Sequence, residues 1–349
     1  MVPAESIRLP PKRDAAVARV IRSWRELTGG GRDGPGMRRT LVACSGGADS
    51  SALALCLAAA GGEIALGHVV HDLRSAVEAE ADRDSVRRLA EVLDRPFFEQ
   101  RVEVKRAGGN LEAAARRLRY AALGAIAARE GYAFIATAHH AEDQLETMLL
   151  RLLRGAGPRG LAGIAVSRRM GVGEGTSVQV IRPMLGVGRD EAEQICLASG
   201  WRWQVDATNA DIGRDRNFLR ARVIPLLLDR FPAAAERASD SAALMGSMAG
   251  LLSRDAEALP CERSAGEVTW PRRALREVDE VVAAEALRLG FAWLGGGKGM
   301  DRVGSKRLRE ACRVIRSNRG GVRKMAWPGV VVEVTKTEVH MKLEAVSDG

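Results

Sequence analysis

The residues with the clearest chemical potential form a serine- and glycine-rich loop, Ser45-Gly46-Gly47-Ala48-Asp49-Ser50-Ser51. Apolar or small residues precede the loop and an Ala/Leu-rich run follows it, which predicts a buried strand, a tight turn and a helix. Glycines let the backbone approach a ligand closely, and N–H groups at a helix N-terminus attract anions. The loop contains no lysine, so it is not a Walker-type phosphate loop. These residues predict either an anion site or an ordinary turn whose serines cap the helix.

A second polar group follows a later predicted strand, in Ala138-His139-His140-Ala141-Glu142-Asp143-Gln144-Leu145-Glu146-Thr147. Asp143 and Glu146 are three residues apart on a predicted helix, so their side chains lie on one face. The apolar residues of this helix indicate that it is buried, and its acids then need a partner. Two carboxylates could bind Mg²⁺ or a substrate ammonium group, and His139 and His140 could contact phosphate or transfer a proton. The alternative is that acids in a first helical turn only stabilise the helix dipole.

Arginines are concentrated in two further segments. In the stretch from Asn110 to Tyr120, Glu112, Arg116 and Arg119 follow a helical spacing of i, i+4 and i+7. Near the end of the same region stand Asn209, Arg216, Asn217 and Arg220. The forked guanidinium group suits phosphates and bases, although such a stripe is also typical of a solvated, salt-bridged helix face.

Strands and helices alternate regularly from residue 40. Strands are expected at 40–44, 63–70, 97–104 and 133–138, and helices at 50–60, 77–93, 111–130 and 142–154. This alternation predicts an α/β fold, a doubly wound parallel sheet with its ligand beyond the carboxyl ends of the strands. Residues 45–51, 68–74 and 137–140 fall at that edge. Residues 155–160 match G-x-G-x-x-G but follow a helix, so we interpret them as a helix stop and a flexible basic loop rather than a dinucleotide site.

The C-terminal part differs from this pattern. We expect an N-terminal extension at 1–35, a catalytic domain at 36–231 and a mostly helical, basic region at 232–349 that ends in a short strand pair, 330–334 and 338–343. Residues 301–325 contain nine Lys or Arg and two acids. Five of these cations have helical spacing and would share one face, which predicts contact with a nucleic-acid backbone: Arg302, Lys306, Arg309, Arg313 and Arg316.

Composition limits the class of protein. The chain has 349 residues, 46% hydrophobic and 28% charged, with a net charge of +9. These values indicate a globular protein, and no apolar run is long enough to span a membrane. The N-terminus lacks the pattern of a secretion signal, and the five cysteines include no Cys-x-x-Cys pair. We therefore expect reduced thiols, a cytoplasmic location and no zinc or iron–sulfur site.

Taken together, these motifs resemble the PP-loop ATP pyrophosphatases and, within them, the tRNA(Ile)-lysidine synthetase family. The resemblance covers residues 38–230 and rests on the Ser45–Ser50 loop, His68 to Arg74, Asn110 to Tyr120, Ala138 to Thr147, Arg151 to Gly155, Gly160-Leu161 and Asp206 to Arg220. It implies that ATP and Mg²⁺ are used to adenylate C2–O of the wobble cytidine in the CAU anticodon of tRNA(Ile). The ε-amine of free L-lysine then displaces AMP.

The resemblance also implies roles for particular residues. Asp49, Asp143, Glu146, Arg116 and Arg220 would be catalytic, and Asp143 and Glu146 would bind lysine. The residues implied for ATP are Ser45, Gly46, Gly47, Ala48, Asp49, Ser50, His71 and Arg74. Those implied for tRNA are Arg216, Arg302, Lys306, Arg309, Arg313 and Arg316.

The chain departs from the family pattern at Val70 and Asp72, where the family usually has Asp and Gly, and at Glu142, where it usually has Asp. We therefore assign no metal ligand at these positions, and the oligomeric state, a homodimer included, stays open. Two other functions compete with the main one. A thiolating PP-loop enzyme acting on tRNA typically needs paired cysteines, and a nucleotide-binding protein without turnover would leave the basic helix and the acid pair without a purpose.

Overall fold

The structure is a computed structural model that describes residues 7–29, 38–73, 75–107, 110–173, 175–204, 215–295, 303–317 and 321–344. The chain divides into two compact units. The first comprises Met1–Arg151 and Gly163–Ala242, and the second comprises Leu152–Ala162 and Ala243–Gly349. The division falls within helix α10 (Ala234–Glu257), downstream of residue 231, where the sequence analysis places the end of the catalytic domain. That domain boundary stays a prediction.

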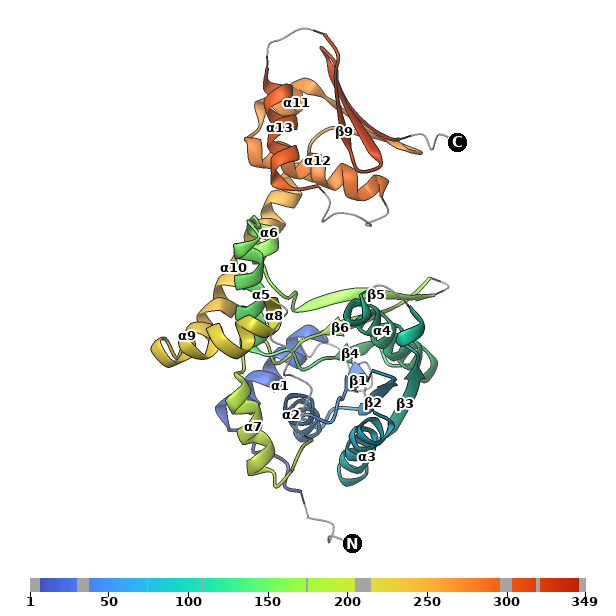
Figure 1. Ribbon diagram of the computed structural model, residues 1–349, viewed down its shortest axis with the longest axis vertical. Helices are drawn as coiled ribbons and strands as arrows, with labels where there is room; N and C mark the ends of the chain where they lie inside the picture. Colours follow the sequence, from blue (N-terminus) through green and yellow to red (C-terminus); the bar gives the residue numbers. More distant parts are fainter. Residues whose placement is uncertain are drawn as a thin grey trace. The chain divides into compact units, whose positions relative to one another are not determined.

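A six-stranded sheet forms the centre of the first unit, with the strand order β3-β2-β1-β4-β6-β5 (Figure 1). The first five strands in this order are parallel: β3 (Phe97–Val102), β2 (Ile64–His71), β1 (Thr40–Ala43), β4 (Phe134–Ala136) and β6 (Thr176–Ile181). The predicted doubly wound parallel sheet is confirmed. Strand order reverses at β1, whose neighbours are β2 and β4, so a ligand crevice is expected beyond the ends of β1 and β4.

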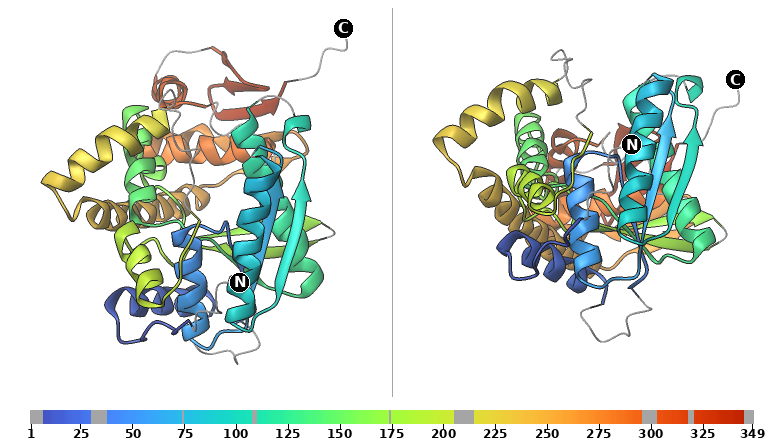
Figure 2. Two further views of the ribbon diagram at one scale, coloured as in Figure 1. Left: turned by 60° about the horizontal axis from the view of Figure 1, so that its bottom comes forward. Right: turned by 90° about the horizontal axis from the view of Figure 1, so that it is seen from below.

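Helices cover both faces of this sheet (Figures 1 and 2). Alternate residues of the strands enter two different cores, because successive side chains of a strand point to opposite faces. Val42 and Leu66 pack with helices on one face, whereas Leu41 and Ala65 pack with α4 (Leu111–Glu130) on the other. The helices of the first face are α1 (Ala15–Leu27), α2 (Ala48–Ala59), α3 (Ala76–Val92) and α7 (Arg189–Ala198).

Two local features of the first unit are absent from the regular alternation. The Gly- and Arg-rich stretch after residue 165 contains a further strand, β5 (Ser167–Gly173), which pairs antiparallel with β6 at the sheet edge. The helical segment from Asp215 is divided into α8 (Asp215–Phe218), a π-helical turn (Leu219–Val223) and α9 (Ile224–Arg230). Pro225 explains the division, because its nitrogen cannot donate to the carbonyl of Ala221.

Helix α5 (Ala141–Leu153) follows β4, and α6 (Pro158–Leu161) follows α5. The prediction of a flexible loop at 155–160 is therefore wrong in part, because residues 158–160 belong to α6. Arg159 of α6 donates to Ser253 Oγ and to Glu285 Oε1, each at 3.2 Å, within the second unit. The short 3-10 helix Lys105–Ala107 after β3 completes the elements of the first unit.

The second unit combines helices with a five-stranded antiparallel sheet of order β7-β8-β11-β10-β9. The predicted strand pair is confirmed as β10 (Val330–Val334) and β11 (Glu338–Leu343). The other strands were not foreseen: β7 (Glu262–Ser264), β8 (Glu267–Pro271) and β9 (Arg323–Trp327). Helices α11 (Arg272–Glu277), α12 (Glu280–Leu294) and α13 (Ser305–Arg316) pack on this sheet around one apolar core. Of the helices described, none is long and apolar enough to cross a membrane.

Candidate active site

The serine- and glycine-rich loop joins β1 to α2 at the point where strand order reverses. Gly46 has φ = +92°, and a Cβ there would come within 3.3 Å of the backbone oxygen of Asp82. Both facts require glycine at this position. Gly47 is the N-cap of α2 and has no side-chain cap. The first N–H groups of α2 are therefore left for a ligand, as an anion site requires.

Hydroxyl groups hold the loop in shape from inside. The Ser50 hydroxyl accepts from the backbone N–H of Ser45 at 3.1 Å and donates to Gly47 O at 3.1 Å. Ser51 donates to the same carbonyl at 2.9 Å. Behind the loop, buried His68 places Nδ1 2.9 Å from Cys44 O. Ser50 and Ser51 thus shape the loop, and Ser45, which is exposed, is the serine that can reach a phosphate.

The predicted acid pair faces the two arginines of α8 and the π-helical turn. Glu146, with 1% of its side chain exposed, forms ion pairs with Arg216 and with Arg220, whose Nε lies 2.9 Å from Glu146 Oε2. Arg220 also donates from Nη2 to Asp143 Oδ1 at 2.9 Å. The structure therefore brings together three predicted catalytic residues and Arg216. Any cationic ligand that binds these carboxylates must displace the two guanidinium groups or share the carboxylate oxygens with them.

His140 connects this acid pair to the loop. Its Nε2 lies 3.5 Å from Asp143 Oδ2 and 3.8 Å from Asp49 Oδ2, and its Nδ1 lies 2.9 Å from Glu142 Oε2. Burial alone would lower the pKa of His140, but the bond to Glu142 and the charges of Asp143 and Asp49 raise it above its ordinary value. Conversely, burial tends to raise the pKa of Asp143, and the positive charges of His140, His139 and Arg220 hold it below its usual range.

His139 behaves in the opposite way although it is adjacent. Its Nδ1 lies 2.9 Å from the hydroxyl of Thr137. Burial, together with the positive charges of Arg182 and Arg116, lowers the pKa of His139 to about 3, despite the attraction of Asp143. His139 is therefore a neutral imidazole and His140 the more readily protonated one.

Asp49 offers the chemistry that a divalent cation prefers. Its Oδ1 is buried and has no hydrogen-bond partner among the described residues. Burial, aided by the nearby charge of Asp143, raises the pKa of Asp49 although His140 lowers it. An orphaned carboxylate oxygen beside a phosphate-type loop suits Mg²⁺, which takes one or two protein carboxylates and completes its shell with substrate phosphates and water. Within the described part of the chain, no group of three or more His, Cys, Asp or Glu is arranged to hold a metal ion.

The three positions that depart from the family pattern all have structural roles. Val70 is buried in the sheet. The carboxylate of Asp72 accepts from the backbone N–H of Val104 at 2.7 Å, which fixes the end of β3. Glu142 accepts from His140 and from the backbone N–H of Arg189 at 3.1 Å. The side chains of Asp72 and Glu142 are thus already engaged in hydrogen bonds to the protein.

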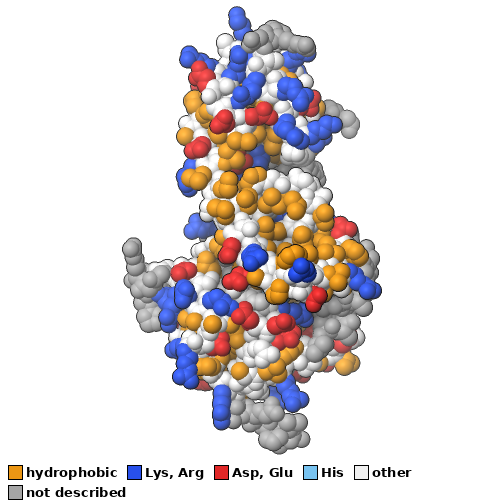
Figure 3. All heavy atoms as spheres, turned by 90° about the vertical axis from the view of Figure 1, so that its left-hand side faces the viewer, with side chains coloured by type: hydrophobic (Ala, Val, Ile, Leu, Met, Phe, Trp, Pro, Cys, Tyr) orange, Lys and Arg blue, Asp and Glu red, His pale blue; other side chains and the backbone are white. Residues whose placement is uncertain are grey.

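The remaining predicted site residues lie apart from this cluster or outside the description. Arg116 lies beside Tyr120 on α4, and His71 ends β2. Arg74 and Arg302 fall outside the described residues. Lys306, Arg309, Arg313 and Arg316 are exposed on α13, whose opposite face buries Ala311, Cys312 and Ile315. Over the second unit, Lys and Arg side chains are interspersed with acidic ones (Figure 3).

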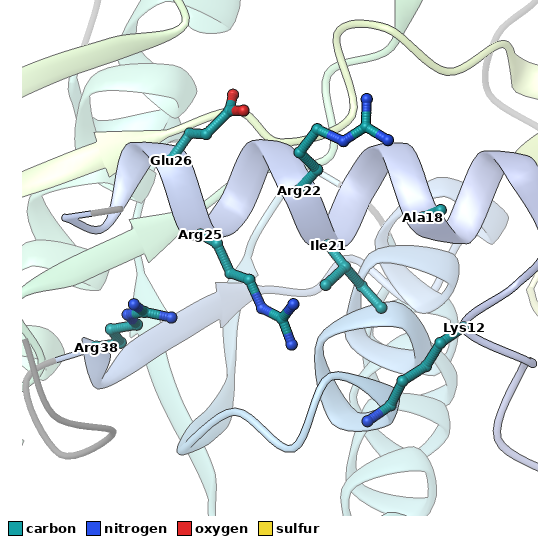
Figure 4. Close-up of a pocket in the computed structure, with 7 residues that line it drawn as sticks. All are labelled: Lys12, Ala18, Ile21, Arg22, Arg25, Glu26 and Arg38. Atoms are coloured by element: carbon teal, nitrogen blue, oxygen red, sulfur yellow. The ribbon is translucent and has the colours of Figure 1, made fainter. Parts of the chain in front are cut away.

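A hollow of about 600 Å³ lies elsewhere in the first unit, against α1 (Figure 4). Arg25 and Lys12 extend to one side of α1 there, whereas Arg22 and Glu26 extend to the other. Arg38, which also lines it, precedes β1 and so stands at the amino ends of the parallel strands. The hollow is thus at the edge opposite to the loop and the acid pair, and it does not belong to the candidate active site.

Three residues near the site escaped the sequence analysis, namely Arg168, Arg182 and Arg189. Arg168 lies on β5, a strand that was not foreseen, and Arg182 directly follows β6. The Arg-Pro pair directly after the apolar residues of β6 was the available signal for Arg182. Arg189 donates its backbone N–H to Glu142, and a main-chain contact of this kind cannot be predicted from the type of the residue.

Comparisons with known proteins agree with this geometry. The family model described as "PP-loop domain" matches residues 19–227, and the chain belongs to this family. A tRNA(Ile)-lysidine synthase of Thermus thermophilus is 41% identical over 257 residues, which are 69% of this chain and 48% of that protein. One of Escherichia coli O157:H7 is 40% identical over 62% of this chain and 49% of its own length, and one of Alkalilimnicola ehrlichii is 35% identical over 86% and 65%.

The chain spans about half the length of the first of these relatives. Among solved structures, the U34-tRNA thiolase NcsA from Methanococcus maripaludis with its [4Fe-4S] cluster is similar, with a TM-score of 0.50 and 13% identity over 67% of this chain and 81% of that one. At this identity the likeness concerns the fold alone.

Proposed function

We propose that the chain is a tRNA(Ile)-lysidine synthetase that uses ATP and free L-lysine to modify the wobble cytidine of a CAU anticodon, in the cytoplasm. The observation that carries the proposal is the juxtaposition, through His140, of the Asp143/Glu146 pair with Asp49 of the Ser-Gly-Gly loop, at the point where strand order reverses. A phosphate-type loop accounts for the use of ATP. The two carboxylates account for a cationic second substrate.

The proposed reaction has two steps. In the first, C2–O of the cytidine attacks the α-phosphorus of ATP, and the bond to the β-phosphate breaks to release pyrophosphate. The loop N–H groups and the Ser45 hydroxyl bind phosphate oxygens, and His140, whose pKa is raised, lies beside Asp49 of the same loop, where negative charge develops. Mg²⁺, held by Asp49 and phosphate oxygens, would supply further charge stabilisation for the departing pyrophosphate.

In the second step the ε-amine of lysine attacks C2, the C2–O bond breaks and AMP leaves. Asp143 and Glu146 bind and orient the cationic groups of lysine, and Arg216 and Arg220 hold these carboxylates in place before lysine enters. Arg116 lies on the α4 face of the same sheet edge, where it would contact phosphate or RNA.

The thiolating alternative finds less support. Cys44, Cys56, Cys196 and Cys312 are buried, and burial raises the pKa of Cys196 to about 12 and that of Cys312 to about 11. Such thiols are poor nucleophiles, because the thiolate is the reactive form.

The test incubates the full chain with ATP, labelled lysine and a tRNA(Ile) transcript carrying CAU, and measures pyrophosphate and labelled RNA. We expect pyrophosphate release that depends on the tRNA, and lysine attached at the wobble position. A transcript with another anticodon, and ornithine in place of lysine, serve as controls. Pyrophosphate release that ignores tRNA, or none at all, would contradict the proposal.

A further inference from the structure

A second group of arginines, distinct from the acid pair's two arginines, surrounds Tyr120, and its charges act on His139 together with that of Asp143. The guanidinium carbon of Arg116 lies 5.1 Å from the centroid of the Tyr120 ring, and that of Arg168 lies 5.3 Å from it. Arg116 also places Nη2 3.5 Å from the Tyr120 hydroxyl. Arg182 interacts with the same hydroxyl, and Arg119 is the neighbour of Tyr120 in the chain. Three elements therefore contribute: α4, β5 and the residue that follows β6.

Within the described ranges, none of these four arginines forms an ion pair with an acid. Arg182 is 95% buried, since only 5% of its surface is exposed. Its Nη1 donates to Ala165 O at 2.5 Å, but its buried Nε has no hydrogen-bond partner among the described residues. A buried guanidinium donor without an acceptor is costly in a native protein, so it points to a missing anionic partner.

The electrostatics agree with this geometry. Burial lowers the pKa of Arg182, and Arg116 and Arg168 lower it further, although Tyr120 acts in the opposite direction. Burial alone would raise the pKa of Tyr120, yet Arg116, Arg182 and Arg119 bring it below its ordinary value. The cluster therefore carries an excess of positive charge that an anion would relieve.

The shape of the arginine group favours a polymeric ligand over a small nucleotide. Arg116, Arg119 and Arg168 are exposed, so most of the cluster forms an open surface instead of an enclosed pocket. Small ligands bind in concave sites, whereas the phosphates of a nucleic-acid backbone are contacted by Arg and Lys side chains along the strand. The cluster also lies with α4 on one face of the sheet, whereas the Ser45–Ser51 loop leads into α2 on the other.

We propose that Arg116, Arg119, Arg168 and Arg182, arranged around Tyr120, form a binding site for the phosphodiester backbone of the RNA strand on the α4 side of the active site. The proposal rests on the proposed function, because it takes RNA to be the substrate. Arg182 interacts with the Tyr120 hydroxyl and adds positive charge from the buried side, and the three exposed arginines follow the strand. Tyr120 is a positioning residue that keeps two of the guanidinium groups over its ring.

The test compares Arg168→Gln with Arg169→Gln in the full chain. Both residues are exposed on β5, but adjacent side chains of a strand point to opposite faces, so only Arg168 faces Tyr120. Binding of tRNA(Ile) is measured at several salt concentrations, and ATP binding is measured separately. We expect Arg168→Gln to weaken tRNA binding about three- to tenfold and to lower the salt slope by about 0.7, with less than a twofold effect of Arg169→Gln.

Other outcomes would contradict the proposed RNA-backbone site. Equal losses in the two variants would reveal only general surface charge, and a loss confined to ATP binding would assign the cluster to the nucleotide. If neither variant changes binding, the cluster takes no phosphate. Arg182→Lys, which keeps the charge but loses the fork, is expected to weaken tRNA binding as well. Failure of the wild-type chain to transfer lysine would contradict the proposed function instead, because these binding contrasts do not depend on turnover.

Discussion

Arg216 and Arg220, beside the acid pair, carry the same guanidinium group as the arginines around Tyr120 but have opposite surroundings. The first two are neutralised by Asp143 and Glu146 within the protein. Those around Tyr120 have an aromatic ring, a backbone carbonyl and one another as neighbours, with no described acid. From this difference we propose that the acid pair takes a cation, which would compete with the two arginines, and that the Tyr120 group takes an anion that the described part of the protein does not supply.

The strongest test of this difference between the two arginine groups removes one charge of the acid pair. We expect Glu146→Gln to lower lysine transfer by about 10²–10³, because removal of one partner of a buried, hydrogen-bonded charge pair costs about 2–5 kcal/mol. Pyrophosphate release without lysine should fall less. Labelled-lysine incorporation and pyrophosphate release are measured on the same preparations.

Glu91→Gln is the matched control, since Glu91 is exposed on α3. Unchanged lysine affinity and turnover in Glu146→Gln would show that the acid pair is only a structural partner of the arginines.

The glycine loop allows a second test. In Gly46→Ala, the new Cβ would lie 3.3 Å from the backbone oxygen of Asp82, at a residue whose φ is +92°, so the loop must shift. We expect kcat/KM for ATP to fall by about 10- to 100-fold, because small displacements of a positioned reactant are expensive. Gly61→Ala has a similar φ of +77° but nothing within 4 Å, and it therefore reports the backbone strain alone. Equal ATP kinetics in the two variants would contradict the loop assignment.

The sequence predicts these features to different extents. Regular apolar alternation defines β1, β2 and α4 with nearly their observed bounds, and the parallel sheet then places residues after β1 and β4 at one edge. Helical spacing also places Asp143 and Glu146 together. It cannot show that Arg216 and Arg220 face them, because these residues are about 70 positions away along the chain. Nor can it show that Arg168 reaches Tyr120, since Gly- and Arg-rich sequence conceals β5 and side-chain packing alone decides the contact.

The two adjacent histidines provide a pH test of the same contrast. The pKa of His139 is about 3 in the folded chain and near 6.5 in the unfolded chain, so only the unfolded chain gains a proton between these values. The free energy of unfolding should therefore decrease by about 2 kcal/mol from pH 7 to pH 5 on account of His139. His139→Asn should remove most of this decrease in chemical denaturation.

His140 should act with the opposite sign. Its folded pKa is raised, so its stabilising contribution is fully present below about pH 6.5 and is lost as the pH rises through the folded value. His140→Asn should reduce the loss of stability on the alkaline side, where His139→Asn should have no effect. Identical pH profiles for the two variants would contradict the opposite directions of the two pKa shifts.

The smallest effect is expected where the cations are most exposed, on α13 of the second unit. Arg309 and Arg313 are exposed on one face of this helix, and its other face is buried in the core. Exposed cations that contact an RNA backbone contribute mainly through counterion release. The double variant Arg309→Gln/Arg313→Gln should therefore weaken tRNA binding about threefold near physiological salt and lower the salt slope by about 1 to 2. Arg263→Gln, an exposed arginine on β7, is the control. A salt slope that stays at the wild-type value would restrict RNA binding to the first unit and leave the Tyr120 group as its main cationic surface.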